Sequence, residues 1–154
     1  MDKPVLYIIK VGGHLIDDQK RLTAFLELFS NLPATTNTGI PIYKLLVHGG
    51  GKMATQLGEQ LGVPAQMVEG RRITDSETLK IVTMVYAGYI NKNIVAALQS
   101  KKMHALGICG ADANIVRAHK RIHANTDYGF VGDIDTVDTE KIVQLLEAGL
   151  SLVM

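Results

Sequence analysis

The sequence predicts an α/β protein built as a three-layer αβα sandwich with a mainly parallel sheet. Short apolar runs rich in β-branched residues alternate with segments of helical periodicity, an order that favours parallel strands covered by helices on both faces. Two of the apolar runs end in glycine-rich turns, where parallel sheets commonly bind ligands. The 154 residues, 47% hydrophobic and 20% charged, suffice for one domain with a proper core, spanning residues 1–154.

The first third of the chain predicts two strands and two helices. Residues 5–9 form a β-branched and aromatic run typical of a buried strand. Residues 17–29 carry apolar side chains at helical spacing. After a loop rich in Pro, Thr, Asn and Gly, residues 42–47 predict a second buried strand. Residues 51–61 are expected to be helical and to end at the following glycine and proline.

A long helix is expected from about residue 75 to residue 100. Thr74 and Glu77 have capping-box spacing, so the Thr74 side chain is expected to accept from the Glu77 amide. Apolar residues then occupy most of the circumference of the helix, which requires cover on more than one side. Its own domain and a second subunit are both sources of that cover.

The last third predicts a strand at residues 105–108, a β-ribbon of residues 113–118 and 130–135, and a helix at residues 139–148. The final residues form an apolar run that predicts the beginning of another strand. A chain terminus inside a buried parallel strand is unusual. We therefore expect this chain to be a truncated form of a longer protein, with a C-terminal half absent.

Charge and composition argue against several classes of protein. The chain has 16 Lys and Arg and 15 Asp and Glu, so no strong field attracts nucleic acid or an anionic membrane. No uninterrupted apolar run reaches the roughly 18 residues of a membrane span, and the N-terminus does not resemble a signal peptide. The single cysteine, Cys109, excludes an internal disulfide and is expected to be buried. We expect a cytoplasmic protein with no nucleic-acid or membrane partner.

The two glycine-rich turns indicate an anion-binding site. IIKVGG ends the first strand and LVHGGG ends the second. Free backbone N–H groups at helix N-termini attract anions, and glycine has no Cβ to block their approach. The common phosphate loop does not fit, because Leu46 stands at its first glycine and Met53 follows Gly51 and Lys52. The dinucleotide pattern ends in Ala54 in place of glycine. Tight turns without a ligand are the alternative explanation.

Four motifs carry a family resemblance. IIKVGG, LVHGGG, EGRRIT and YAGYINKNIV, in this order and spacing, resemble the N-terminal half of the acetylglutamate kinase branch of the amino acid kinase family. DYGFVGDI resembles the segment that follows the central hairpin in these kinases. His14 after the first glycine pair matches this branch better than the aspartokinases or uridylate kinases. The resemblance covers essentially the whole chain and implies ATP-dependent phosphorylation of the side-chain carboxylate of an N-acyl-L-glutamate, in arginine biosynthesis.

The resemblance also implies a role for each motif residue. Lys10 would stabilise the transition state of phosphoryl transfer, because an ammonium offsets developing negative charge. Arg72 would clamp the α-carboxylate of the substrate with its two-pronged guanidinium. The glycines would supply N–H groups, those of Gly12 and Gly13 to the phosphoryl oxygens and those of Gly49, Gly50 and Gly51 to the nucleophilic carboxylate.

ATP with Mg²⁺ would be the co-substrate, held mostly by the absent C-terminal half. The helix from about 75 to 100 would cross its symmetry mate in a homodimer, with Val85, Gly88 or Tyr89 near the crossing. Acetyl and succinyl acyl groups both fit the sequence. Two alternatives remain: a kinase for another carboxylate or a carbamate in the same family, and a non-catalytic substrate-binding or dimerisation module.

The remaining polar candidates are weaker. His119 and His123 have the spacing of zinc ligands on a helix, but they fall in a predicted hairpin, so no metal site is expected. Arg71 is expected to be a solvated surface charge, and His48 fits a structural role equally well. Asn91 and its neighbour Lys92 either face the site or follow the polar side of the helix.

Overall fold

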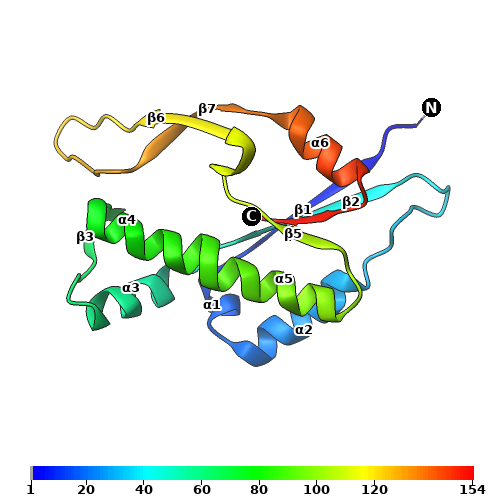
Figure 1. The fold of residues 1–154 in the computed structure, drawn as a ribbon, viewed down its shortest axis with the longest axis horizontal. Helices are drawn as coiled ribbons and strands as arrows, with labels where there is room; N and C mark the ends of the chain where they lie inside the picture. The colour runs from blue at the N-terminus through cyan, green and yellow to red at the C-terminus, as the bar shows by residue number, and fades with distance from the viewer. Residues whose placement is uncertain (1) are drawn as a thin grey trace.

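The computed structural model describes residues 2–154 and has a four-stranded parallel sheet at its centre, in the order β1-β2-β8-β5 (Figure 1). The elements in chain order are β1 (Val5–Val11), α1 (Gly13–Ile16), α2 (Gln19–Ser30), β2 (Ile42–His48), α3 (Gly51–Gln60), β3 (Gln66–Val68), β4 (Arg71–Ile73), α4 (Ser76–Thr83), the π-helix η1 (Met84–Ile90), α5 (Asn91–Ser100), β5 (Ala105–Gly107), the 3₁₀ turn η2 (Asp112–Asn114), β6 (Val116–Lys120), β7 (Gly132–Val137), α6 (Thr139–Glu147) and β8 (Ser151–Val153). The predicted α/β class with a parallel sheet is confirmed.

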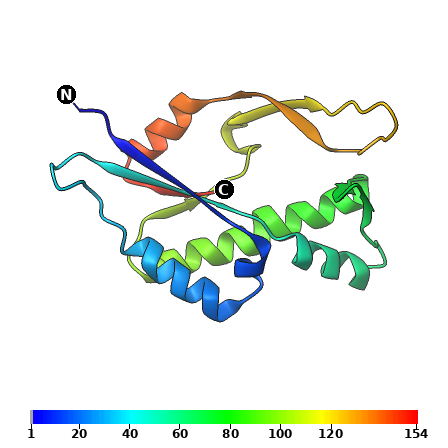
Figure 2. The same cartoon turned by 180° about the vertical axis from the view of Figure 1, so that it is seen from behind.

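Helices cover the sheet on both faces, as the two opposite views in Figures 1 and 2 show. One face carries α1, α2, α3 and the long helix, and the other carries α6 and the β6–β7 ribbon. Because strand side chains alternate, neighbouring residues of β2 enter different cores. Leu46 lies in the larger core with Phe29 and Leu98, whereas Leu45 lies in the smaller core with Leu146.

The edge strand β1 is covered on one face only. Its residues Ile9 and Val11 contact the larger core. Ile8 points to the opposite face and is 63% exposed, since the core beneath α6 contains residues of β2 and β8 but none of β1. β8 lies between β2 and β5, so the last described strand occupies the interior of the sheet.

The long helix begins one residue later than predicted. Asp75 is the N-cap residue, and its Oδ1 accepts a hydrogen bond from the Thr78 amide at 2.8 Å. Thr74 was wrongly predicted as the cap, because its backbone is bonded to the ribbon segment: its amide donates to Tyr128 and its carbonyl accepts from Phe130. The neighbouring aspartate satisfies the free amides of the first turn instead.

A π-helical segment in the middle of this helix was not predicted. The side chains that face the larger core are separated by four, five, four and four residues: Ile81, Val85, Ile90, Ile94 and Leu98. The five-residue step coincides with η1, where one additional residue per turn keeps the buried face directed at the sheet. Val85 is only 2% exposed within its own chain, so its predicted place in a subunit contact is wrong.

By length and composition the same helix would also satisfy a test for a membrane span. Ser76–Ser100 has 25 residues and a mean hydropathy of 1.3 over an 18-residue window. A core helix meets the same criterion, and this helix packs against the larger core through the row of buried side chains described above. One-third of the window is buried in this chain, and the large apolar side chains of the helix that are exposed are Met84 and Tyr89.

Several boundaries differ from those expected. The first ribbon strand begins at Val116 rather than residue 113, because Ala113 and Asn114 take positive φ angles in a 3₁₀ turn. The second is Gly132–Val137. The β3–β4 hairpin was missed, since its turn uses Glu69 and Gly70, a weaker signal than Asn-Gly. The predicted burial of Cys109 is only partial.

Candidate functional site

The two glycine-rich turns lie side by side at the carboxyl edge of the sheet. Parallel pairing aligns Lys10 with Val47 and Val11 with His48, so β1 and β2 end next to each other. A Cβ built on Gly49 would lie 3.8 Å from the backbone nitrogen of Gly13. The structure therefore brings together the two turns that the sequence places 36 residues apart.

Neither glycine of the first turn is required by the fold. Gly12 has φ −82° and ψ 167°, which any residue adopts, and Gly13 is the first residue of the helix α1. Apart from its chain neighbours and the backbone of its own helix, a Cβ on either residue would meet no atom of residues 2–154 within 4 Å. A tight turn thus does not explain this pair. Open space beside bare backbone is what an external group needs in order to reach the amides.

The second turn has a different reason for one of its glycines. Gly50 precedes α3 with φ 158° and ψ 21°. A Cβ there would lie 2.2 Å from Cδ1 of Ile90 and 3.3 Å from the ring of Tyr86. Both side chains come from η1, so the π-helical segment presses directly on the glycine turn. A side chain at this position would force Ile90 and Tyr86 to move, and the φ angle also favours glycine.

The amides of both turns are available to a ligand. Among residues 2–154, the backbone N–H groups of Gly12, Gly13, Gly50 and Gly51 donate to no carbonyl outside their own helices. The first amides of a helix have no acceptor within it. At α3 they also lie at the positive end of the helix dipole, which favours an anion.

Arg72 reaches this edge of the sheet from the β3–β4 hairpin. Its Nη2 donates to the Gly51 carbonyl at 3.1 Å and to Oγ1 of Thr55 at 2.8 Å. Both acceptors are uncharged, so they orient the guanidinium without neutralising it. A carboxylate at the glycine turn would therefore meet an unmatched positive charge.

A cleft of about 550 Å³ lies beside Arg72, between β4, α4 and the ribbon. Two other arginines line it. Arg121 hydrogen-bonds Asp133, which lowers the pKa of that carboxyl and raises the pKa of the guanidinium, so its charge is matched. Arg71 is exposed, as predicted, and its charge makes a smaller contribution to the lowered Asp133 pKa. Arg72 is thus the arginine that the structure places against the glycine turn.

Lys10 is exposed near the end of β1. Since Ile9 and Val11 face the larger core, alternation turns the Lys10 side chain to the opposite face of the sheet. Lys10 thus stands two residues before Gly12, on the face of the sheet that carries α6.

Sequence reasoning left Asn91 unassigned, and the structure buries it where strands end. Asn91 is 1% exposed, and its Nδ2 donates to the Val153 carbonyl at 3.0 Å. Lys92 is exposed, and its Nζ donates to the Gly107 carbonyl at 2.8 Å. A polar residue in the buried row of an otherwise apolar helix face is the signal that could have indicated Asn91.

The histidine pair has no set of metal ligands around it. His119 Nδ1 lies 2.6 Å from Oδ1 of Asp135, and the His123 ring packs edge-on against Tyr128. In the part of the chain that the structure describes, no three His, Cys, Asp or Glu side chains are grouped as a metal site requires.

Comparison with known proteins gives relatives over nearly the whole chain. Acetylglutamate kinase of Cytophaga hutchinsonii is 55% identical over 150 residues, which are 97% of this chain and 54% of that protein. The Phocaeicola vulgatus protein of the same name is 49% identical over 152 residues, 99% of this chain and 56% of its own length. This chain thus spans about half the length of the curated relatives it matches.

Solved structures share the fold. A Streptococcus mutans protein superposes with a TM-score of 0.75 and 21% identity, over 97% of this chain and 57% of its own. N-acetylglutamate synthase from Neisseria gonorrhoeae, complexed with coenzyme A and N-acetyl-glutamate, has a TM-score of 0.70 and 22% identity, over 99% of this chain and 33% of its own. Residues 6–154 match the Amino acid kinase family, and the chain therefore belongs to that family.

Proposed function

We propose that this chain forms the acceptor-binding part of a kinase that transfers the γ-phosphoryl group of ATP to the side-chain carboxylate of an N-acyl-L-glutamate. The observation that carries the proposal is the first glycine turn, which has bare backbone facing open space that the fold itself does not require. The names of the relatives support the choice of substrate. ATP enters as the Mg²⁺ complex.

The proposed reaction needs positioning and charge stabilisation rather than a general base. The acceptor carboxylate is already ionised at neutral pH. Its oxygen forms a new bond to the γ-phosphorus as the bond to the bridging oxygen breaks, giving an acyl phosphate and ADP. Negative charge on the phosphoryl oxygens is then the main obstacle, and oriented N–H groups and cations reduce it.

The site residues divide this work. Arg72 binds the α-carboxylate, and its position at the Gly51 carbonyl sets the distance between that end of the substrate and the second glycine turn. The free amides of Gly50 and Gly51 in the second turn orient the nucleophilic carboxylate. Gly12 and Gly13 bind the phosphoryl oxygens, and Lys10 offsets the charge that develops on them.

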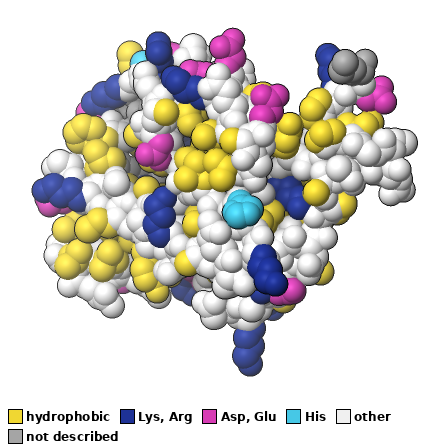
Figure 3. All heavy atoms as spheres, turned by 45° about the vertical axis from the view of Figure 1, so that its right-hand side comes forward, with side chains coloured by type: hydrophobic (Ala, Val, Ile, Leu, Met, Phe, Trp, Pro, Cys, Tyr) yellow, Lys and Arg dark blue, Asp and Glu magenta, His cyan; other side chains and the backbone are white. Residues whose placement is uncertain are grey.

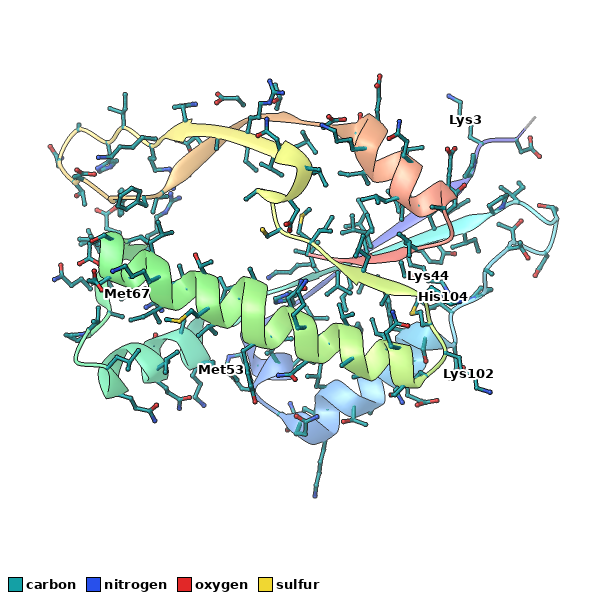
Figure 4. The ribbon with its side chains drawn as sticks, viewed as in Figure 1. Lys3, Lys44, Met53, Met67, Lys102 and His104 are labelled. Carbon is teal, nitrogen blue, oxygen red and sulfur yellow. The ribbon has the colours of Figure 1, made fainter. Side chains whose placement is uncertain are left out.

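We also propose that the protein is a cytoplasmic homodimer, with no nucleic-acid or membrane partner. The long helix carries exposed apolar side chains at Met84 and Tyr89, 51% and 62% exposed. Met53 of α3 lies beneath this helix (Figure 4) and lines two neighbouring hollows, of about 390 and 350 Å³, together with Tyr89. On the face seen in Figure 3, hydrophobic groups are divided by charged ones. The contact is therefore assigned from these residues rather than from a broad apolar patch.

A titration followed by NMR tests the substrate. N-acetyl-L-glutamate or its N-succinyl analogue should shift the amide signals of Gly12, Gly13, Gly50 and Gly51. Gly39 and Gly149 are the internal controls, because they precede β2 and β8 at the opposite edge of the sheet. N-acetyl-L-aspartate, one methylene shorter, should bind more weakly. Shifts confined to the control glycines, or none at millimolar ligand, would contradict the proposal.

An arginine variant separates charge from geometry in the same titration. Arg72→Lys keeps the positive charge but loses the two-pronged contact, so the affinity for the N-acyl-glutamate should fall. Arg71→Lys is the matched control, because Arg71 is exposed beside the same cleft and is not held at the glycine turn. Equal losses from the two variants would remove the special role of Arg72.

A further inference from the structure

The buried amide of Asn91 lies where three strands end. β2, β8 and β5 end at His48, Val153 and Gly107, and all three residues contact Asn91. A Cβ on Gly107 would lie 1.9 Å from Asn91 Oδ1, so the amide fills the space that this glycine leaves. Lys92 Nζ donates a hydrogen bond to the same oxygen at 3.2 Å.

The contacts determine which way the Asn91 amide faces. A backbone carbonyl only accepts, so the atom 3.0 Å from the Val153 oxygen must be the NH₂ group. The other amide atom accepts from the Lys92 ammonium, which only donates. Among residues 2–154 no buried side-chain nitrogen or oxygen lacks a partner, so a flipped amide would create a mismatch that the structure otherwise avoids.

This orientation in turn determines the tautomer of His48. Asn91 Nδ2 lies 3.3 Å from His48 Nε2, which must therefore be the accepting nitrogen. In a neutral imidazole the other nitrogen then carries the hydrogen. His48 Nδ1 lies 3.0 Å from the Gly49 carbonyl, and a carbonyl needs that hydrogen. The two contacts of the ring agree on one tautomer.

Asn91, His48 and the Gly49 carbonyl form a chain of two hydrogen bonds, called the relay below. The Gly49 carbonyl connects this relay to the proposed binding site. Its oxygen and the Gly50 N–H belong to one planar peptide group, which is trans. In a trans peptide the two bonds point in opposite directions. A carbonyl held toward His48 therefore directs the Gly50 N–H away from the ring, and this N–H has no backbone acceptor among the described residues.

We propose that Asn91 is a positioning residue, which acts through the His48 tautomer to direct the Gly50 N–H at the acceptor carboxylate. The inference rests on the proposed function for the identity of that carboxylate. The relay itself exists without ligand. Asn91 touches no reacting atom and works through His48 alone.

The first experiment measures the tautomer in the free chain. Ring ¹⁵N shifts at mildly alkaline pH should show His48 protonated at Nδ1 and bare at Nε2. Asn91→Asp has the same shape but no NH₂ donor, so the ring should change to the Nε2–H tautomer and release the Gly49 carbonyl. A free chain with His48 protonated at Nε2 would overturn the relay, whatever ligand the site binds.

The second experiment measures binding of N-acetyl-L-glutamate by the same variants. Asn91→Asp should weaken binding at least about tenfold, the expected effect of losing one hydrogen bond to a charged group. Gln99→Met is the matched control: Gln99 also lies on α5 and donates its amide to a strand carbonyl, that of Ala105, at the distant end of the helix. It should change neither the tautomer nor the affinity. Unaltered affinity in a folded Asn91→Asp chain would overturn the proposal.

Two replacements of His48 separate position from volume. The amide nitrogen of asparagine takes the place of Nδ1, whereas that of glutamine takes the place of Nε2. His48→Asn should therefore keep the bond to the Gly49 carbonyl and most of the affinity for N-acetyl-L-glutamate. His48→Gln should lose the bond to the Gly49 carbonyl and most of that affinity. The reverse order would overturn the proposal. If the unmodified chain binds no N-acyl-glutamate, the proposed function fails while the tautomer measurement still tests the relay.

Discussion

The two glycine-rich turns look alike in sequence, but they differ in whether the surrounding structure requires glycine. A Cβ at Gly12 or Gly13 would meet no atom of residues 2–154 within 4 Å, apart from its chain neighbours and its own helix. A side chain at Gly50 would collide with Ile90 and press on Tyr86. The first turn is therefore a bare surface, and the second is a backbone compressed by a helix. Similar composition does not imply similar constraint. The space beside Gly12 is open, whereas the space beside Gly50 is filled by side chains of the long helix.

The largest expected loss of stability comes from a substitution in the long helix, which packs against the second glycine turn. Val85 is 2% exposed, so Val85→Asp places a carboxylate in the larger core. This should lower the free energy of unfolding by about 4 kcal/mol. Tyr89→Asp, on the exposed side of η1, should leave the fold intact and split the proposed homodimer. Urea denaturation and sedimentation measure the two outcomes. A sedimenting monomer for the unmodified chain at tens of micromolar would contradict the dimer.

Gly50→Ala tests the compression itself. The new Cβ meets Ile90 Cδ1, and the backbone conformation is unfavourable for alanine, so the free energy of unfolding should fall by about 3 kcal/mol. Ile90→Val removes the colliding atom. In the double variant the loss should be smaller than the sum of the two single losses, as a double-mutant cycle in urea would show. Additive losses would mean that the helix does not constrain this turn.

Gly12→Ala should have the opposite balance. The alanine is compatible with φ −82° and ψ 167°, so stability should be unchanged or raised by about 0.5 kcal/mol. Phosphoryl transfer in a full-length relative carrying the equivalent change should nevertheless fall, because a methyl group occupies the space beside the amides. A marked loss of stability in urea would show that the first turn, too, is constrained by the fold.

The smallest effect concerns the start of the long helix. The Thr78 amide bonds to Asp75 and lowers the pKa of its carboxyl below the usual range. A lowered pKa in the folded state means that the contribution of Asp75 is present above about pH 4 and is lost as the pH falls through the lowered value. Asp75→Asn keeps a capping oxygen that does not titrate. Thermal unfolding of the two chains should therefore differ in its dependence on pH below 4, and parallel curves would contradict this.

The strands of the central sheet, the glycine turns and most helices could be predicted from local patterns, whereas the β3–β4 hairpin was missed. Residues 42–47 and 139–148 were assigned within one residue of the observed β2 and α6, because burial on one or both faces imposes a recognisable spacing. The resemblance of four motifs also indicated the family to which the chain belongs. These features depend on residues close in the sequence, or on motifs whose order along the chain carries the information.

Contacts between distant segments decided the rest. Thr74 lost its predicted capping role to Asp75 because the ribbon binds its backbone. The bond from Arg72 to the Gly51 carbonyl and the bond between Asn91 and His48 join residues far apart in the sequence. The π-helical step at η1 keeps one helix face against the larger core, so it too depends on packing. A sequence specifies which groups seek burial or a partner, but which group meets which is decided when the helices close on the sheet. Chain entropy and steric fit, summed over the whole fold, select among partners that are locally equivalent.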